Sequence, residues 1–456
     1  MRIAALASAL LATACGADAV SHAPEGVGAR VSDSVATVVN VRWTTAEPST
    51  GYVSYGKTSS LGLTTPLETA SATGHSQALL ELSAGSLYYY RVITWDGHDA
   101  GASPVQTFRT GALPAALPTF AQAGDSTSSD GFDQLTLLPI SSDQTSVSAV
   151  APTGEVLWYH TEDSDRTVTR AVLSVDGKSV VYNALGAGAG ADSELVRAPL
   201  DGSSVDSISV PGLGRDFLEK PDGTFAALAA DVRDFAGAPL RGDQIVEIDA
   251  SGTTTSIWST WDCFDPQESP GDGPDGEWTG AVALALDKGK LPSDPSDDAY
   301  YVSLRNISAI ARVERATGRC TWVLGSAAKT LDFADAASAF EHPAGFFAQG
   351  TKLAVLDADG AGSGSSRVVE YTLDVEANTA MSTLTYAPAP ALHVDELGAV
   401  TLLTNHRRLA NWSTNGRLEA VNDDGNVLWS LAAGTGVTLG YHTLIDSLYS
   451  EAAGTP

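Results

Sequence analysis

The residue of this chain best suited to chemistry is an arginine at the end of an apolar segment. Residues 299–304 have the sequence AYYVSL, which predicts a buried β-strand, and Arg305 follows at its tip. Alternate residues share one face of a strand, so Arg305 lies on the face of Tyr301 and Ser303. A guanidinium there can hold a tetrahedral oxyanion through paired N–H donors. A surface arginine paired with one of the many carboxylates is the alternative, and spacing alone favours it.

Two histidines are further candidates. His342 comes just before a predicted strand and is flanked by phenylalanines in the stretch AFEHPAGFF. A partly buried imidazole near a channel can act as a nucleophile or a general base, although a lone histidine more often has a structural role. His406 forms a basic spot with Arg407 and Arg408, which indicates either an anion contact or a solvated loop.

The sequence predicts no metal, nucleotide or other cofactor. None of the eight histidines has the spacing of a zinc motif. The segment from Asp357 begins like a calcium loop, but Val368 stands where the twelfth-position acid belongs. The acidic loop 262–278 could hold calcium weakly, and a solvated loop is the alternative that we favour. A phosphate-binding P-loop is absent from the sequence.

Composition indicates an all-β protein with an acidic surface. The chain has 456 residues, enough for one small and one large domain. Its 26 Lys and Arg against 55 Asp and Glu give a net charge of −29, which argues against nucleic acid as a partner. Short runs rich in Val, Thr, Tyr and Trp alternate with Gly, Asp, Asn and Ser turns, which is typical of β-strands.

Residues 1–15 resemble the signal peptide of a bacterial lipoprotein, with Arg2 before an apolar run and Cys15 after small residues. We therefore expect Cys15 to carry a lipid that holds the protein to a membrane of the cell envelope without spanning it. An ordinary cleaved signal peptide is the alternative. Disulfides persist outside the cytoplasm, so we predict a bond between Cys263 and Cys320, against two free thiols.

The rest of the chain divides into a tether, a small domain, a linker and a large domain. Residues 16–28 are small and polar, and residues 113–119 contain two prolines. Between them, residues 29–112 predict about seven short strands, and the stretch SAGSLYYYRV resembles a corner of fibronectin type III domains. Such domains are spacers or binding modules, so we assign no chemistry to this one.

A hairpin motif repeats through residues 120–456. Asp, Ser or Thr before Gly, usually followed by Trp, recurs at intervals of roughly 50 to 66 residues, the last interval being about twice as long. At about 56 residues per unit, this length predicts a six-bladed β-propeller, with a large β-sandwich as the alternative. The innermost strands of a propeller line a channel, and their ends supply the site.

The stretches SLRNISAIARVERATGRCTWVLG, FEHPAGFFAQGTKLAVLDADG and SRVVEYTLD resemble the bacterial, nucleotide-independent aryl-sulfate sulfotransferase family. The resemblance implies a six-bladed propeller that moves a sulfuryl group from an aryl sulfate to a phenol, with a histidine carrying the group transiently. Arg305 and His342 match the family's arginine and its sulfated histidine. Arg215, Arg367 and His406 are the remaining candidates for substrate binding.

The chain departs from this family at two positions. Gly280 and Arg215 stand where the family has histidines, and an arginine cannot be a general acid near neutral pH. Two hypotheses therefore stay open, together with a purely structural lipoprotein that would leave the retained pair unexplained. One is sulfuryl transfer by His342 and Arg305, and the other is a propeller that binds an anion, a glycan or a protein.

Overall fold

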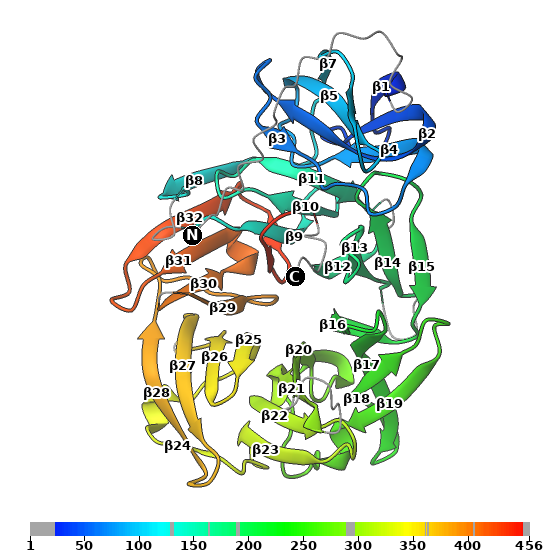
Figure 1. Ribbon diagram of the computed structural model, residues 1–456. Coiled ribbons are helices and arrows are strands. Elements are labelled where there is room, and N and C mark those ends of the chain that lie inside the picture. Colours follow the sequence, from blue (N-terminus) through cyan, green and yellow to red (C-terminus); the bar gives the residue numbers. More distant parts are fainter. Residues whose placement is uncertain are drawn as a thin grey trace. The chain divides into compact units, whose positions relative to one another are not determined.

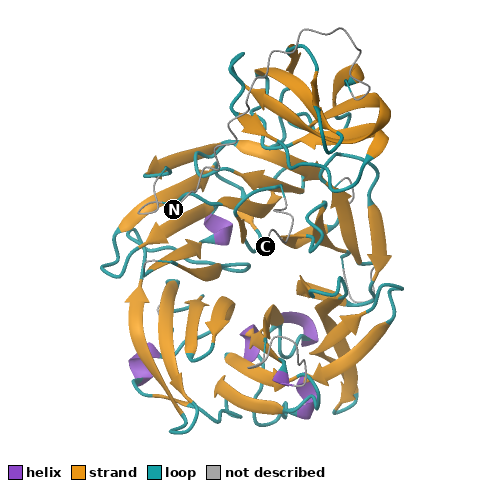
Figure 2. Ribbon diagram, in the orientation of Figure 1, coloured by secondary structure: helices purple, strands orange, loops and turns teal. Residues whose placement is uncertain are grey.

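The computed structural model describes residues 23–127, 132–162, 165–187, 192–288, 297–360, 362, 364–404 and 406–449. Cys15, the predicted signal peptide and much of the tether lie outside these residues. The described residues form strands joined by turns and short 3-10 helices (Figure 2). Within that part of the chain, no helix has the length and apolar character that crossing a bilayer requires. The all-β class predicted from the sequence is confirmed.

The chain contains two compact units, which are described separately. The first comprises residues up to Arg30, Asn40–Gln77 and Leu87–Phe108, and the second comprises Val31–Val39, Ala78–Ser86 and the chain from Arg109 onward.

The first unit is built on a seven-stranded sheet with the order β1-β2-β5-β6, in which β3 and β4 pair with β2 and β7 pairs with β5. Along β2, Val41 and Trp43 are buried while their neighbours are more exposed, the alternation of a sheet with one covered face. The likeness to fibronectin type III stays a prediction. The strands are β1 (Glu25–Val31), β2 (Val39–Gly56), β3 (Leu63–Thr64), β4 (Ala72–Leu79), β5 (Leu87–Trp95), β6 (Ala100–Ala102) and β7 (Gln106–Arg109).

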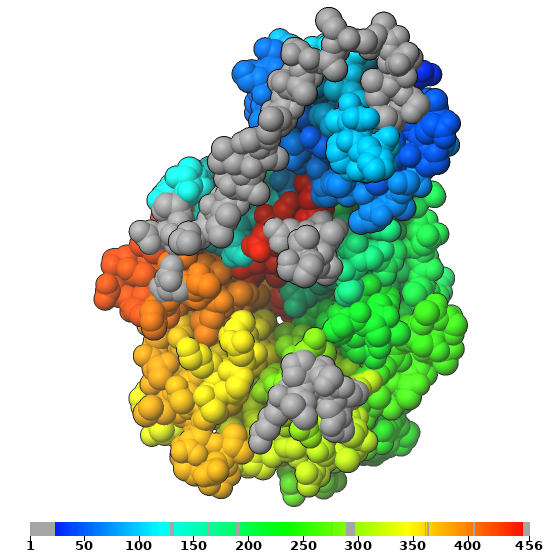
Figure 3. All heavy atoms as spheres, viewed as in Figure 1, coloured from blue at the N-terminus to red at the C-terminus, as the bar shows by residue number. Residues whose placement is uncertain are grey.

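The second unit is a propeller of six sheets, and this part of the sequence prediction is also confirmed (Figure 1). Five blades begin with a strand beside the central channel and step outward in chain order. The blades follow one another round the ring from cyan through green and yellow to red (Figure 3). Blades 1 to 3 comprise β9 (Leu135–Ser141), β10 (Ser146–Val150) and β11 (Val156–Thr161); β12 (Thr167–Leu173), β13 (Ser179–Leu185), β14 (Glu194–Pro199) and β15 (Asp206–Ser209); and β16 (Leu213–Glu219), β17 (Phe225–Phe235), β18 (Ala238–Ile248) and β19 (Thr254–Ser259).

Blades 4 to 6 continue the same pattern, and β24 adds a short parallel strand at the outer edge of blade 5. Their strands are β20 (Ala281–Asp287), β21 (Ala299–Leu304), β22 (Ala309–Glu314) and β23 (Cys320–Gly325); β24 (Asp332–Phe333), β25 (Pro343–Gln349), β26 (Lys352–Asp357), β27 (Arg367–Asp374) and β28 (Thr379–Tyr386); and β29 (Ala399–Leu403), β30 (Arg407–Asn411), β31 (Arg417–Val421) and β32 (Val427–Ala433).

The ring is closed at two strand edges. β8 (Phe120–Gly124), from the start of the unit, pairs with β32 at the outer edge of blade 6. β33 (Thr438–Leu439) and β34 (Thr443–Ile445), from its end, pair with β9 and form the inner edge of blade 1. Both ends of the propeller are thus held by backbone hydrogen bonds to a neighbouring part of the ring.

Two of the repeated tryptophans join neighbouring blades. Trp158 in β11 is fully buried and donates its indole N–H to the carbonyl of Leu200 in the next blade, at 3.2 Å. Trp429 in β32 donates in the same way to Pro152 of blade 1, at 2.8 Å. A buried indole needs a partner for its N–H, and a turn of the adjacent blade supplies one.

A disulfide bond joins Cys263, just after blade 3, to Cys320 at the start of the outer strand of blade 4, with 6.4 Å between the Cα atoms. This is the disulfide bond that we predicted from the sequence. The bond ties the loop 263–280, which carries several residues of the candidate site, to the rim of the propeller.

Candidate active site

The candidate residues meet at the end of the channel where the inner strands begin. β21 runs antiparallel to β20, and its last residue, Leu304, pairs with Ala281 at the start of that inner strand. Arg305 follows directly and so emerges at this end of the propeller. His342 immediately precedes the inner strand β25, and Arg215 lies near the start of the inner strand β16. Three segments far apart in sequence are therefore brought to one end of the channel.

Arg305 begins a 3-10 helix, Arg305–Ile307, that turns the chain away from the strand. Its backbone N–H donates to the carbonyl of Gly280 at 3.0 Å, which fixes the turn. One guanidinium nitrogen donates to the backbone carbonyl of Asp395 at 3.1 Å. Its Nε is buried without a hydrogen-bond partner, and no ion pair joins Arg305 to a carboxylate of the described residues. The side chain is thus held in place while its charge is left unneutralised.

His342 has a left-handed backbone, with φ of +50°, a conformation that non-glycine residues rarely adopt. Its Nε2 lies 2.6 Å from Oδ2 of Asp272, and its Nδ1 lies 3.8 Å from Oδ2 of Asp359. The side chain is 23% exposed, so solutes can reach it. A neutral imidazole that donates Nε2–H to Asp272 keeps its lone pair on Nδ1, which is the requirement for a nucleophile.

Hydrogen bonds join the turn that contains Arg305 to the turn that contains His342. Ser308, which ends the 3-10 helix, accepts the backbone N–H of His342 on its hydroxyl at 3.2 Å. Ser303, at the end of β21, donates its hydroxyl to the carbonyl of Pro343 at 3.0 Å. The backbone N–H of Asp272 donates to Asn306 at 3.2 Å, so the carboxylate partner of His342 is anchored to the same helix.

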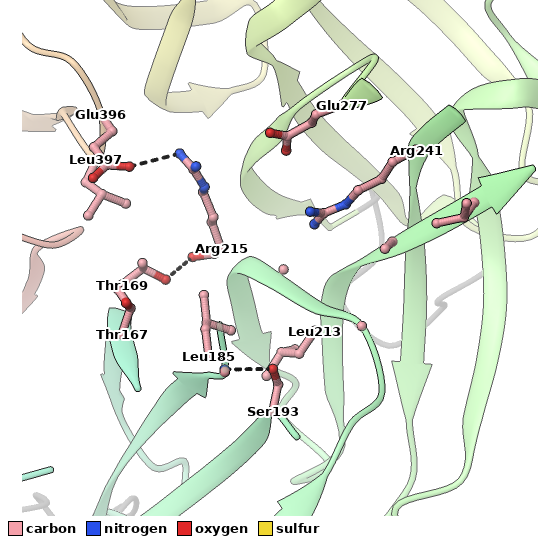
Figure 4. A pocket seen from close by; sticks show the side chains of 15 residues that line it. Thr167, Thr169, Leu185, Ser193, Leu213, Arg215, Arg241, Glu277, Glu396 and Leu397 are labelled. Carbon is pink, nitrogen blue, oxygen red and sulfur yellow. Dashed lines mark hydrogen bonds and ion pairs between the residues drawn. The ribbon is translucent and has the colours of Figure 1, made fainter. Parts of the chain in front are cut away.

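Arg215 lines a cavity of about 340 Å³ at this end of the channel (Figure 4). Its Nη1 lies 3.2 Å from Oε2 of Glu396. Glu396 follows Asp395, so one short loop contacts both Arg215 and Arg305. Arg241 of β18 and Glu277 point toward the same space. The sequence analysis missed Arg241; its place two residues before a buried aspartate, on the same face of β18, is the signal that could have found it.

A buried polar cluster lies along the inner strands. Nε of Arg170, in β12, donates to Asp216 at 2.8 Å, and the fully buried Asp216 also accepts the backbone N–H of Leu284 at 2.8 Å. Burial raises the pKa of Asp216, and Arg170 and Leu284 oppose that shift. The imidazole of His442 shares a hydrogen bond with the hydroxyl of Thr401 at 2.9 Å. Burial, assisted by the charge of Arg170, lowers the pKa of His442 to about 3, so this histidine is neutral.

Gly280 packs closely against the side chain of Asn306. Its φ is +58°, and a Cβ would lie 2.5 Å from Nδ2 and 2.6 Å from Cγ of Asn306. The neighbouring backbone is fixed as well, because Thr279 and Ala281 both donate to the buried carboxylate of Asp243, at 2.6 and 2.8 Å. The position that carries a histidine in the resembling family is therefore closed by Asn306 in this chain.

Two of the sequence candidates are set apart from this group for different reasons. Arg367 is at the same end of blade 5, but its guanidinium donates to Asp357 at 2.8 Å and to the carbonyls of Ala337 and Ala339 at 3.2 and 2.7 Å. His406 lies between β29 and β30, at the opposite end of blade 6, with a side chain 85% exposed and 3.7 Å from Asp423. The structure thus brings Arg305, His342 and Arg215 to one end of the channel, where Arg367 is bound by Asp357, and it places His406 at the other end.

Within the described residues, no three His, Cys, Asp or Glu side chains are grouped so that they could hold a metal ion. The chemistry available at this end of the channel is that of guanidinium, imidazole and carboxylate groups.

Comparison with known proteins gives similarities of fold and one family match. A streptogramin B lyase structure is 12% identical, with a TM-score of 0.38, and the match covers 72% of this chain and 98% of that one. A nidogen/laminin complex is 12% identical over 68% of this chain and 98% of that one, with a TM-score of 0.43. A putative 6-phosphogluconolactonase from Bacteroides fragilis is 12% identical over 88% and 98%, with a TM-score of 0.36. These similarities are too weak to inform function.

No curated protein matches the chain. The family model of the arylsulfotransferases (ASST) does match it, over residues 123–341, from β8 through the blade of Arg305 to the residue before His342.

Proposed function

We propose that the protein is an arylsulfotransferase that moves a sulfuryl group from an aryl sulfate to a phenol through His342, without a nucleotide donor. The family match over residues 123–341 supports aryl sulfotransferase-like chemistry. The observation that carries the mechanism is the fastening of His342 to the turn that presents Arg305, a guanidinium with no carboxylate partner among the described residues.

The reaction follows from this arrangement in two steps. A ring nitrogen of neutral His342 attacks sulfur, the N–S bond forms, and the bond from sulfur to the aryl oxygen breaks, so that a phenolate leaves. The acceptor phenol then attacks the same sulfur, the N–S bond breaks, and the proton of the acceptor passes to solvent or a nearby carboxylate. Asp272 holds the imidazole throughout. Arg305 faces the sulfuryl oxygens, whose charge it stabilises in both transition states.

The test uses 4-nitrophenyl sulfate as donor and phenol as acceptor. We expect release of nitrophenolate and, after a rapid quench, one added sulfuryl group on the peptide that contains His342. The variant His342→Gln should lose both signals, and Arg305→Lys should lower turnover by about 10²- to 10³-fold because a point charge replaces two fixed donors. His406→Gln and Arg319→Lys, which make the same changes at exposed positions, serve as matched controls.

A second function, binding without turnover, is favoured by the closure of Gly280. Neither Gly280 nor Arg215 can protonate a leaving phenol, whereas the resemblance implies a histidine at both positions. If no activated aryl sulfate gives either nitrophenolate release or a His342 adduct, the transferase is excluded and this function is left.

The location of the protein rests on the sequence alone. We propose that Cys15 is lipidated and anchors the protein in the bacterial cell envelope, a proposal that metabolic labelling with a fatty-acid analogue would test. A Cys15→Ser variant that is still labelled would contradict it.

A further inference from the structure

We propose that the cavity beside Arg215 binds a small aromatic anion that also carries a hydroxyl group, with Arg241 as its principal anion contact. A phenolic acid such as 4-hydroxybenzoate has this chemistry. Its role as the acceptor of the sulfuryl group rests on the proposed function, whereas its binding does not.

The first argument is the state of Arg241. Its guanidinium points into the cavity from β18 (Figure 4). Its Nε is buried without a hydrogen-bond partner, and none of the described carboxylates lies within ion-pair distance of it. The nearest acidic neighbours are Glu277, whose backbone forms a bridge with that of Arg241, and Asp243, which is buried and already accepts hydrogen bonds from Thr279 and Ala281. In a chain of 55 acidic residues, a half-buried arginine without an ion pair to a described carboxylate is typical of a site for an anionic group from outside.

The second argument is that Arg215 can be released to the same ligand. Its ion pair with Glu396 spans 3.2 Å, and the two side chains are 37% and 47% exposed. Pairs this exposed contribute little free energy and exchange easily. Glu396 therefore acts as a weak internal competitor for the anion, and a carboxylate placed between Arg215 and Arg241 would meet two guanidiniums.

The third argument is the rest of the lining. Leu185, Leu213 and Leu397 supply apolar surface for a ring, and the volume of about 340 Å³ is at the lower end of small-molecule sites. Glu277 lines the same space and makes no ion pair with a described residue. Its carboxylate can only accept hydrogen bonds, so it favours a ligand that brings a hydroxyl as well as an anion.

Calorimetric titration of the purified protein, without any donor, tests the site with three probes: 4-hydroxybenzoate, benzoate and phenol. We expect 4-hydroxybenzoate to bind at least about 10-fold more tightly than either of the others, since each lacks one of the two polar groups. Arg241→Gln should weaken binding of 4-hydroxybenzoate about 10-fold or more. Glu396→Gln should tighten it several-fold, because Arg215 then has no competitor.

Arg319→Gln is the matched control, because it removes the same charge from a side chain that is 72% exposed in blade 4. It should bind as the unaltered protein does, and thermal melting should show that all variants are folded. Equal affinity for 4-hydroxybenzoate and phenol, unchanged binding in a folded Arg241→Gln protein, or no tightening in Glu396→Gln would each overturn the proposal. Because binding is measured without a donor, a protein that binds 4-hydroxybenzoate but transfers no sulfuryl group would contradict only the proposed function.

Discussion

Proton supply to the leaving phenol is decided by two residues at the channel end. Asn306 fills the space next to Gly280, and Arg215 carries a group that stays protonated at any accessible pH. His442, the nearest buried histidine of the polar cluster, is neutral and fully enclosed. In the proposed transfer, none of these three positions can supply a proton, so we expect the phenolate of the donor to leave with little assistance.

The rate of sulfuryl transfer is accordingly expected to depend steeply on the acidity of the leaving phenol. General acid catalysis contributes about 10²- to 10⁴-fold in enzymes that have it. We expect kcat/KM for 4-nitrophenyl sulfate to exceed that for phenyl sulfate by at least about 10²-fold. Steady-state kinetics over a series of substituted donors measures the slope, and a flat series would show that an acid is present after all.

The conformation of Gly280 gives a prediction about stability. Gly280→Ala combines a left-handed backbone with a Cβ placed 2.5 Å from Asn306. We expect the free energy of unfolding to fall by about 2 to 4 kcal/mol, as strain and overpacking add. Gly223→Ala is the control, because its φ is +79° but no atom lies within 4 Å of the new Cβ. Urea unfolding should show a clearly smaller loss for the control, and equal losses would disprove the role of Asn306.

His442 makes stability depend on pH. Its folded pKa of about 3 lies below the unfolded value of about 6.5, so between these values only the unfolded chain binds the proton. Stability is therefore complete above about pH 6.5 and falls on acidification, by up to about 1.4 kcal/mol per pH unit. Between pH 6.5 and 5, the folded His442→Gln variant should lose about 1 to 2 kcal/mol less than the unaltered protein in urea titrations. A parallel loss in both would exclude His442 as the cause.

At the scale of the element, the hairpins show what the sequence can and cannot predict. The recurring Gly and Trp pattern predicts the outer strands because each tight turn needs a left-handed residue and each indole a buried partner, as at Gly154 and Trp158. The same pattern predicts a strand ending before Arg305. It carries no information on which segment of another blade meets that strand, so the contacts of Ser308 and Asp272 with His342 appear only in the structure.

Only part of the site could be predicted, because a local sequence pattern does not show which distant segments meet in space. Arg305 and His342 lie in stretches that resemble a known family, whereas Arg241 lies on an ordinary hairpin strand. Its importance depends on having no described carboxylate within ion-pair distance, and the arrangement of side chains in space decides this. Arg367 is the opposite case: the sequence makes it a candidate for substrate binding, but in the structure its guanidinium donates to backbone carbonyls of a loop distant in sequence.

The disulfide between Cys263 and Cys320 joins segments of two adjacent blades. It closes a loop of 57 residues, and removal of such bonds typically costs about 2 to 5 kcal/mol. We expect the Cys263→Ser, Cys320→Ser double variant to unfold at lower urea concentration by an amount in that range. Thiol reduction of the unaltered protein should match the double variant and should have no effect on the variant itself. Equal stability of the reduced and oxidised proteins would contradict the expectation.

At the scale of the whole propeller, closure depends on the last strands of the unit. β33 and β34 pair with β9, and this segment also contributes the buried residues Leu439, Tyr441 and Leu448. The number of blades could be predicted by dividing the length of the domain by the length of the repeat. The pairing of strands from the two ends of the unit with other blades could not be predicted in this way. The repeat motif does not include β8 or β34.

A chain that ends at Gly436 should therefore lose cooperative folding, while a chain that ends at Tyr449 should keep it. Without β34 the inner edge of blade 1 is unpaired and buried residues of the neighbouring blades face water. Near-ultraviolet circular dichroism and urea unfolding measure the loss, and adding a peptide of residues 437–449 should restore the signal. A stable, cooperatively unfolding chain without these residues would show that closure is dispensable.

The order in which the ribosome delivers the chain gives this closure a further meaning. Arg215, Arg305 and His342 are synthesised well before β34, yet the inner strands that position them form a complete ring only when β34 reaches β9. A nascent chain can hold every candidate catalytic residue and still have no assembled site. The candidate site is therefore assembled late, when the last strands of the unit pair with β9, and not when the candidate catalytic residues are synthesised.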